Sequence, residues 1–240
     1  MSSPRNIEAI PIVRASKLVI LLTLLTSIVG CSKNTPLTYA VRNDDLETVK
    51  ALLARGADVN EKDKNHESPL MIAAWRARPE IVSILLDHAA DINARNEVGG
   101  TALFYAAHLG RVENARVLIA RGARVNDRDI HGFTPLMDAA SRAQSEMVKV
   151  LLQFGADANA KGREAYTPLM HAVWSHDLAT VEAVLAAGPD INATNDKGET
   201  ALMIAQGLNE AKIAQALLSK TDSSATGDKG NAQSTERRGK

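Results

Sequence analysis

This chain of 240 residues has few aromatic residues, a single cysteine and no excess of charge of either sign. Phe, Trp and Tyr make up 3% of the sequence while apolar residues in total make up 45%, a composition that suits small helices packed closely side by side. The single cysteine excludes an internal disulfide bond. The 28 basic residues equal the 28 acidic ones, so the basic excess typical of a nucleic-acid-binding protein is missing.

Motifs of the common catalytic and cofactor sites are also missing. The sequence has no Gly-rich phosphate-binding loop, no His-Glu-x-x-His, no Cys-x-x-Cys and no Gly-x-Ser-x-Gly turn. Of its six histidines, only His171 and His176 are near neighbours, at a spacing that suits a metal pair poorly. We therefore predict no catalytic residue, no cofactor and no metal site, and a protein that is not an enzyme.

What the sequence does contain is a repeat of 33 residues. Five asparagines recur at that spacing: Asn60, Asn93, Asn126, Asn159 and Asn192. In the same phase, Thr-Pro-Leu or a close variant begins at Thr35, Ser68, Thr101, Thr134, Thr167 and Thr200. A unit this short cannot bury its own apolar face and must stack on its neighbours. The repeat therefore predicts a solenoid.

Each unit predicts two antiparallel helices and a β-turn finger. The Thr or Ser before Pro is expected to cap the first helix, because its hydroxyl can accept a hydrogen bond from a free N–H and Pro is tolerated in the first turn. Glycines are expected to end the second helix in a left-handed conformation, at Gly56, Gly122, Gly155 and Gly188.

The pattern Thr-Pro-Leu-x-x-Ala-Ala, an apolar helix and Gly-Ala-Asp-x-Asn resembles the ankyrin repeat. The best copies are Thr134–Ala140 and Arg55–Asn60. The resemblance implies an all-α solenoid of six stacked ankyrin repeats over residues 35–220, each repeat a helix–turn–helix unit with a β-turn finger. The repeats are expected at about 35–60, 61–93, 94–126, 127–159, 160–192 and 193–220. Residues 221–240 lack large apolar side chains and are predicted to be a disordered tail.

Several residues depart from the family pattern where it has Gly. Ala89 replaces the Gly that ends the second helix, and a left-handed Ala there is expected to cost up to about 1 kcal/mol. Other replacements lie between the two helices or in the finger: Ala77, Ala143, His176, His66 and Ala165.

The N-terminus has the pattern of a secretory signal. Basic residues precede Leu18–Gly30, an uncharged apolar run well short of the about 20 residues that span a bilayer. The junction Ile28-Val29-Gly30-Cys31 resembles a bacterial lipobox, which implies cleavage before Cys31 and lipid attachment to that residue. We predict a signal peptide at residues 1–30 and a lipidated tether at residues 31–34. The alternative is an incidental cysteine after an uncleaved anchor.

The lipobox also carries an expectation about location. Two or three acyl chains anchor a protein firmly, whereas one binds a membrane only marginally. Ser32 rather than Asp follows Cys31, which in enteric-type lipoproteins implies release to the outer membrane. We therefore expect a lipid-anchored protein of the bacterial cell envelope, on the outer membrane and facing the periplasm, with the inner membrane left open by Lys33.

The expected binding surface is the concave side of the solenoid, which in the ankyrin family is formed by the fingers and the exposed face of the first helices. Both tryptophans of the chain fall at one repeat position on that side, and Trp and Arg dominate binding hot spots. The predicted protein-binding residues are Trp75, Arg76, His108, Phe133, Arg142, Tyr166 and Trp174. The alternative for each Trp is packing over a neighbouring helix, and Tyr105 and His171 stay open between core and contact.

Together these observations predict a monomeric, membrane-anchored scaffold that binds another protein and no nucleic acid, and that supports or neutralises an envelope enzyme. Two alternatives stay open. An enzyme with a site in the groove would need converging acidic or histidine residues, for which Asp138 and His171 are the one hint. An ankyrin effector acting on a host protein is opposed by acylation at Cys31, because the chain would stay with the producing cell.

Overall fold

The computed structural model describes residues 35–76 and 78–227, and in this part of the chain the regular structure is helical. The first helices of successive repeats are α2 (Pro36–Arg42), α4 (Pro69–Arg76), α6 (Ala102–His108), α8 (Pro135–Ser141), α10 (Pro168–Trp174) and α12 (Ala201–Gly207). The second helices are α3 (Leu46–Ala54), α5 (Pro79–Asp87), α7 (Val112–Ala120), α9 (Ser145–Gln153), α11 (Leu178–Ala186) and α13 (Ala211–Gly227). A short 3-10 turn, η2, covers Arg163–Ala165.

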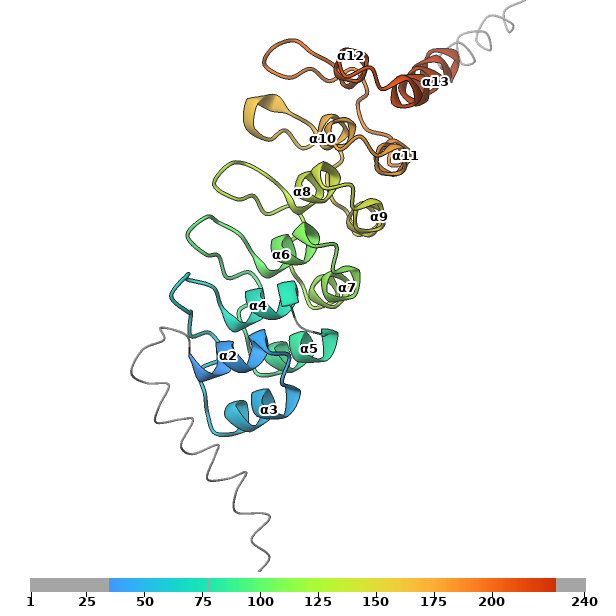
Figure 1. Cartoon of the computed structure of the whole chain (residues 1–240). Helices are drawn as coiled ribbons and strands as arrows, with labels where there is room; N and C mark the ends of the chain where they lie inside the picture. The colour runs from blue at the N-terminus through green and yellow to red at the C-terminus, as the bar shows by residue number, and fades with distance from the viewer. Residues whose placement is uncertain (1–34, 77, 228–240) are drawn as a thin grey trace, which may run out of the picture.

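The helices form two layers in an elongated stack (Figure 1). The first helices make one layer and the second helices the other, and each helix packs on its partner in the repeat and on the matching helix of the next repeat. The fingers are the long loops that precede the first helices α4, α6, α8, α10 and α12. They project from the first-helix layer to one side of the stack (Figure 1). The predicted all-α solenoid is therefore confirmed.

Hydroxyl side chains cap the first helices as predicted. The backbone N–H of Thr38 donates to Thr35 Oγ1 at 3.1 Å, and that of Met137 donates to Thr134 Oγ1 at 3.3 Å. The same contact occurs in the other four repeats. Each such bond satisfies one of the free N–H groups at a helix start, which explains why Thr or Ser recurs in phase with the repeat.

The second helices end in the left-handed conformation that the glycines predicted. Gly122 has φ +95°, and Ala89, at the same place in its repeat, has φ +63°. The Ala89 side chain is exposed. The strained backbone expected at Ala89 is thus present, and no packing of the methyl group offsets it.

The asparagine ladder joins each repeat to the next one. The Oδ1 atom of Asn126 accepts a hydrogen bond of 2.9 Å from the N–H of Asp157, and its Nδ2 atom donates to Gly155 O at 3.1 Å. Asn60, Asn93 and Asn159 accept the equivalent N–H bonds from residues 31 positions further on. These four asparagines therefore each bind the base of the following finger, which explains why Asn recurs in phase with the 33-residue repeat.

The core is a ladder of small and aliphatic side chains between the two layers. Three methionines at one repeat position, Met71, Met137 and Met170, have exposed fractions of 1% or less, whereas Met203 of the last repeat is 56% exposed. The difference follows from stacking, because the first three are covered by a following repeat and Met203 is not.

The C-terminal helix is longer than the repeat pattern predicted. The predicted disordered tail began at residue 221, but α13 continues to Gly227. Extending a helix that already exists is inexpensive, and residues 221–226 contain neither Pro nor Gly to interrupt it. Residues 228–240, the predicted signal peptide and Cys31 lie outside the described residues.

Candidate functional site

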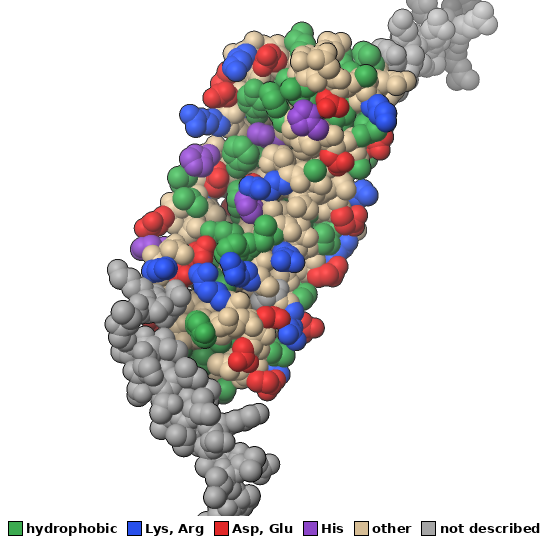
Figure 2. Space-filling view, viewed as in Figure 1, with side chains coloured by type: hydrophobic (Ala, Val, Ile, Leu, Met, Phe, Trp, Pro, Cys, Tyr) green, Lys and Arg blue, Asp and Glu red, His purple; other side chains and the backbone are tan. Residues whose placement is uncertain are grey.

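The seven predicted binding residues belong to the C-terminal ends of the first helices and to the bases of the fingers; we call the surface formed by these two parts of the repeats the finger-side face. Arg76, Arg142 and Trp174 are exposed there. Trp75, His108, Phe133 and Tyr166 are partly buried. Figure 2 shows histidine side chains along the finger side of the stack and basic side chains beside apolar ones near its N-terminal repeats.

The N-terminal part of this face is built around Trp75, on α4. The guanidinium of Arg76 lies over the Trp75 ring, 4.2 Å from its centroid. The Trp75 ring also lies near the Tyr105 ring in a tilted arrangement, with the two centroids 6.4 Å apart. The Nε atom of Arg111 donates to the carbonyl of Trp75 at 3.2 Å. Trp75 therefore has a fixed position and a face already occupied by a cation of its own chain.

Beside it, a polar network fixes Tyr105. The Tyr105 hydroxyl donates to Glu67 Oε1 at 3.1 Å and accepts from Asn96 Nδ2 at 2.9 Å. Arg42 holds the other oxygen of Glu67 at 3.0 Å and also bonds Asp63. Burial, followed by the charge of Glu67, raises the pKa of Tyr105 to about 12. Tyr105 thus acts as a neutral donor within the protein.

The middle of the finger-side face holds Asp138, one of the two residues that an enzyme site in the groove would use. Asp138 Oδ2 lies 3.0 Å from His108 Nδ1 and 3.4 Å from Arg142 Nε. Asp138 is 7% exposed, and burial raises its pKa although His108 and Arg142 oppose that shift. His108 and Arg142, predicted separately as contact residues, are thus tied to one buried acid.

His171, the second of these two residues, is surrounded by aromatic rings and not by charged partners. Its ring lies between Phe133, with centroids 4.8 Å apart, and Tyr166, with centroids 5.7 Å apart. Burial lowers the pKa of His171 to about 4, so the imidazole is uncharged at neutral pH. Asp138 bonds His108 and Arg142 while His171 packs among aromatic rings, so the two do not form the converging pair that catalysis would need.

The C-terminal part of the finger-side face contains a hollow of about 320 Å³. It is lined by Phe133, Arg163, Glu164, Tyr166, His171 and Trp174. The structure thus brings three of the seven predicted residues together around one space. Trp174, one helical turn after His171, is 47% exposed. We name this space the aromatic hollow.

The finger that borders the aromatic hollow differs from the others. An Asp or Asn orders the turn elsewhere, as when Asp129 Oδ1 accepts the N–H groups of His131 and Phe133. Gly162 occupies that position in the fifth repeat, and a Cβ atom there would lie 3.0 Å from Met137 Sδ. The turn is closed by η2 instead.

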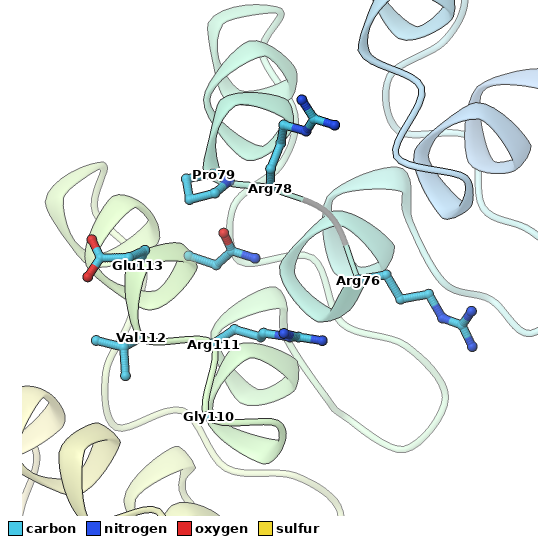
Figure 3. A pocket seen from close by; sticks show the side chains of 8 residues that line it. Arg76, Arg78, Pro79, Gly110, Arg111, Val112 and Glu113 are labelled. Atoms are coloured by element: carbon cyan, nitrogen blue, oxygen red, sulfur yellow. The ribbon is translucent and has the colours of Figure 1, made fainter.

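A second hollow, of about 430 Å³, lies between the second and third repeats. The sequence analysis did not predict it. Arg76, Arg78 and Arg111 line it but point in different directions (Figure 3). Arg78 pairs with Asp44 at 2.8 Å, while Arg76 and Arg111 contact Trp75. Arg78 and Arg111 thus each link two neighbouring repeats, whereas Arg76 covers the ring of the residue before it, and the three guanidinium groups do not converge on a common point.

Residues 35–76 and 78–227 contain no group of three or more His, Cys, Asp or Glu residues arranged to hold a metal ion. None of the helices in these ranges is long and apolar enough to cross a membrane.

Comparison with known proteins agrees with the geometry. The family model described as "Ankyrin repeats (3 copies)" matches residues 13–96, 37–129, 91–162, 128–195 and 169–233, which overlap to cover most of the chain. A search of curated proteins gave no match.

Proposed function

The chain belongs to the ankyrin-repeat family, and from this premise we propose that it is a lipid-anchored scaffold that binds another protein in the bacterial envelope. Ankyrin-repeat proteins are typically non-enzymatic binding scaffolds. The proposal adds the surface that binds, the place where binding occurs and the consequence for the partner.

The observation that carries the proposal is the preorganised row of aromatic and Arg side chains on the finger-side face. Trp75 contacts both Arg76 and Tyr105, and His108 and Arg142 share Asp138. Side chains that are already ordered lose little entropy on binding, whereas each immobilised flexible side chain costs about 0.5–1.5 kcal/mol. A rigid surface of Trp, Tyr and Arg is the kind that forms binding hot spots.

Anchoring through Cys31 is supported by the sequence pattern alone. Three residues separate Cys31 from Thr35, the cap of the first helix. At about 3.3–3.6 Å per residue, the first repeat would begin about 10–15 Å from the lipid. We propose that the scaffold is held close to the outer membrane on its periplasmic side, as a monomer, and that the anchor raises the local concentration of a partner in the same membrane.

The partner would be an envelope enzyme that the scaffold supports or neutralises. Both roles use the same surface and need neither a cofactor nor nucleic acid. They differ in the effect of binding, because a supporting scaffold raises the enzyme's activity or amount and a neutralising one lowers its activity.

A cross-linking capture from envelope extract tests the proposal. The bait is the full chain, compared with a Trp75→Ala/Trp174→Ala double variant and with Phe154→Ala as the matched control. Phe154 is an aromatic residue, 41% exposed, that caps the second-layer helix α9 away from the finger-side face.

We expect the wild type and Phe154→Ala to capture the same protein, and the double variant to lose it while keeping the helical circular dichroism spectrum. Equal capture by all three baits would refute the assignment of the surface. The captured enzyme's activity, measured with and without the scaffold, then separates support from neutralisation.

A further inference from the structure

We propose that the aromatic hollow receives an arginine side chain of the partner protein. The inference rests on the proposed function and adds the chemistry by which the partner is recognised. It concerns one end of the finger-side face, where Phe133, Tyr166, His171 and Trp174 surround the hollow.

The size of the hollow suits one side chain. Its volume of about 320 Å³ lies at the lower end of the range of about 300–1,000 Å³ for sites that enclose whole small molecules. Phe133, His171 and Tyr166 are in ring contact with one another through His171. Trp174, on the same helix as His171, adds an exposed ring to the lining.

The chain itself shows what a tryptophan at this repeat position binds. The Trp75 ring is covered by the guanidinium of Arg76, the next residue. Trp174 occupies the same position three repeats later, but the residue after it is Ser175, whose hydroxyl donates to Ala172 O at 2.7 Å. The Ser175 side chain cannot supply the cation that Trp75 receives from its own helix, and Trp174 stays 47% exposed.

The charges around the hollow also favour a cation. The negative faces of aromatic rings attract a guanidinium, and the acidic residue Glu164 is one of the lining residues. His171 does not repel a cation, because burial lowers its pKa to about 4. Arg163 also lines the hollow, but its side chain is 71% exposed and its Nε atom is 4.0 Å from Glu164 Oε1. An incoming arginine would compete with Arg163 for Glu164.

The finger that carries Glu164 is strained at this place. Glu164 has φ +55° and Ala165 has φ +59°, a left-handed conformation that is unfavourable for residues other than Gly. The Glu164 carbonyl accepts a hydrogen bond of 3.0 Å from the N–H of Asp196, in the next finger, which holds the turn. Strained backbone of this kind concentrates at binding sites, and here it includes Glu164, a residue that lines the aromatic hollow.

The test is a titration of the full chain, labelled with ¹⁵N on tryptophan and kept in a neutral detergent, with the peptide Gly-Gly-Arg-Gly-Gly. The same peptide with citrulline, which has the shape of arginine without its charge, is the matched control. The two tryptophans give two indole N–H signals, which Trp75→Leu and Trp174→Leu variants assign.

We expect the Trp174 signal to shift with arginine peptide and saturate in the millimolar range, while the Trp75 signal stays in place. Citrulline peptide should bind about fivefold more weakly, the loss of one cation–π contact. Glu164→Gln should weaken arginine binding and Arg163→Gln should tighten it. A Trp174 signal that does not move, or that moves equally with citrulline, would overturn the inference.

The two proposals fail in different ways. If arginine peptide does not shift the Trp174 signal while capture of the partner still depends on Trp75 and Trp174, the aromatic hollow binds some other group and the scaffold function stands. If arginine peptide binds but no protein is captured through this face, the chemistry of the hollow holds and the scaffold function fails.

Discussion

Replacing Ala89 by Gly should stabilise this protein. Ala89 ends α5 with φ +63°, and a left-handed conformation costs an L-residue about 1–2 kcal/mol. Glycine avoids that cost but makes the unfolded chain more flexible, which opposes folding by about 0.4–1 kcal/mol. The Ala89 methyl group is exposed, so its removal loses little packing. The net expectation is a gain of about 0.5–1 kcal/mol.

The backbone hydrogen bonds at this position survive the substitution. The N–H of Ala89 donates to Leu86 O at 3.1 Å and its carbonyl accepts from Asn60 Nδ2 at 3.4 Å, and glycine has the same groups. The gain is measured as the rise in the urea midpoint followed by far-UV circular dichroism. In thermal unfolding it should appear as an increase in Tm of about 1–4 °C for a domain of this size.

Two controls separate this cause from a general effect of glycine. Gly122→Ala should destabilise by about the same amount, because Gly122 has φ +95° and an added Cβ would meet no atom within 4 Å. Ala51→Gly, at a partly exposed site in the middle of α3, should destabilise by about 0.5–1 kcal/mol. If Ala89→Gly lowers the midpoint and Gly122→Ala leaves it unchanged, the reasoning about left-handed helix ends is refuted.

Three further predictions concern the repeat ladder, the buried histidine and the anchor. Asn126→Ala should lower the free energy of unfolding, measured by urea titration, by about 1 kcal/mol, because Asp157 N and Gly155 O lose their partner. Asn192→Ala, in the last position of the asparagine ladder, should lower it by less. His171 has a pKa of about 4 in the folded protein against 6.5 in an unfolded chain. Between these two values the unfolded state binds a proton that the folded state does not. The free energy of unfolding should therefore fall by up to about 3 kcal/mol as the pH drops from 6.5 to 4. Urea midpoints across that range should decline less for His171→Leu, and parallel curves would contradict the assignment. Cys31→Ser should leave a larger, unlipidated precursor on gels, and a variant of normal mature size that stays in the membrane fraction would argue against lipidation.

The features that the sequence predicted are those that recur in every copy of the repeat. Thr134 caps α8 and Ala89 ends α5, as their positions in the repeat predict, because both features depend on local backbone geometry. Such features need only the 33-residue period, which fixes which residues are equivalent.

The features that were missed depend on differences between copies. Asp138 stands where other repeats have Ile72 or Tyr105, and its role came from contacts with His108 in the preceding repeat and with Arg142. Comparison of equivalent positions in adjacent repeats could have suggested that pairing.

The unusual fifth finger had a visible signal as well. Gly162 interrupts a series of Asp63, Asn96, Asp129 and Asn195 at one repeat position. The resulting turn at Glu164 could not be derived, because it also depends on the close approach of Met137 and on a hydrogen bond from Asp196.

The placement of the two tryptophans three repeats apart makes the solenoid a molecular ruler. Packed helices lie about 8–10 Å apart, so three repeats separate the rings by about 25–30 Å. An extended segment of about eight or nine residues covers that length, as does a helix of about 20 residues. A partner that engages both rings must therefore present its two anchoring groups at that separation, and a single tight loop of a smaller protein is too short to do so.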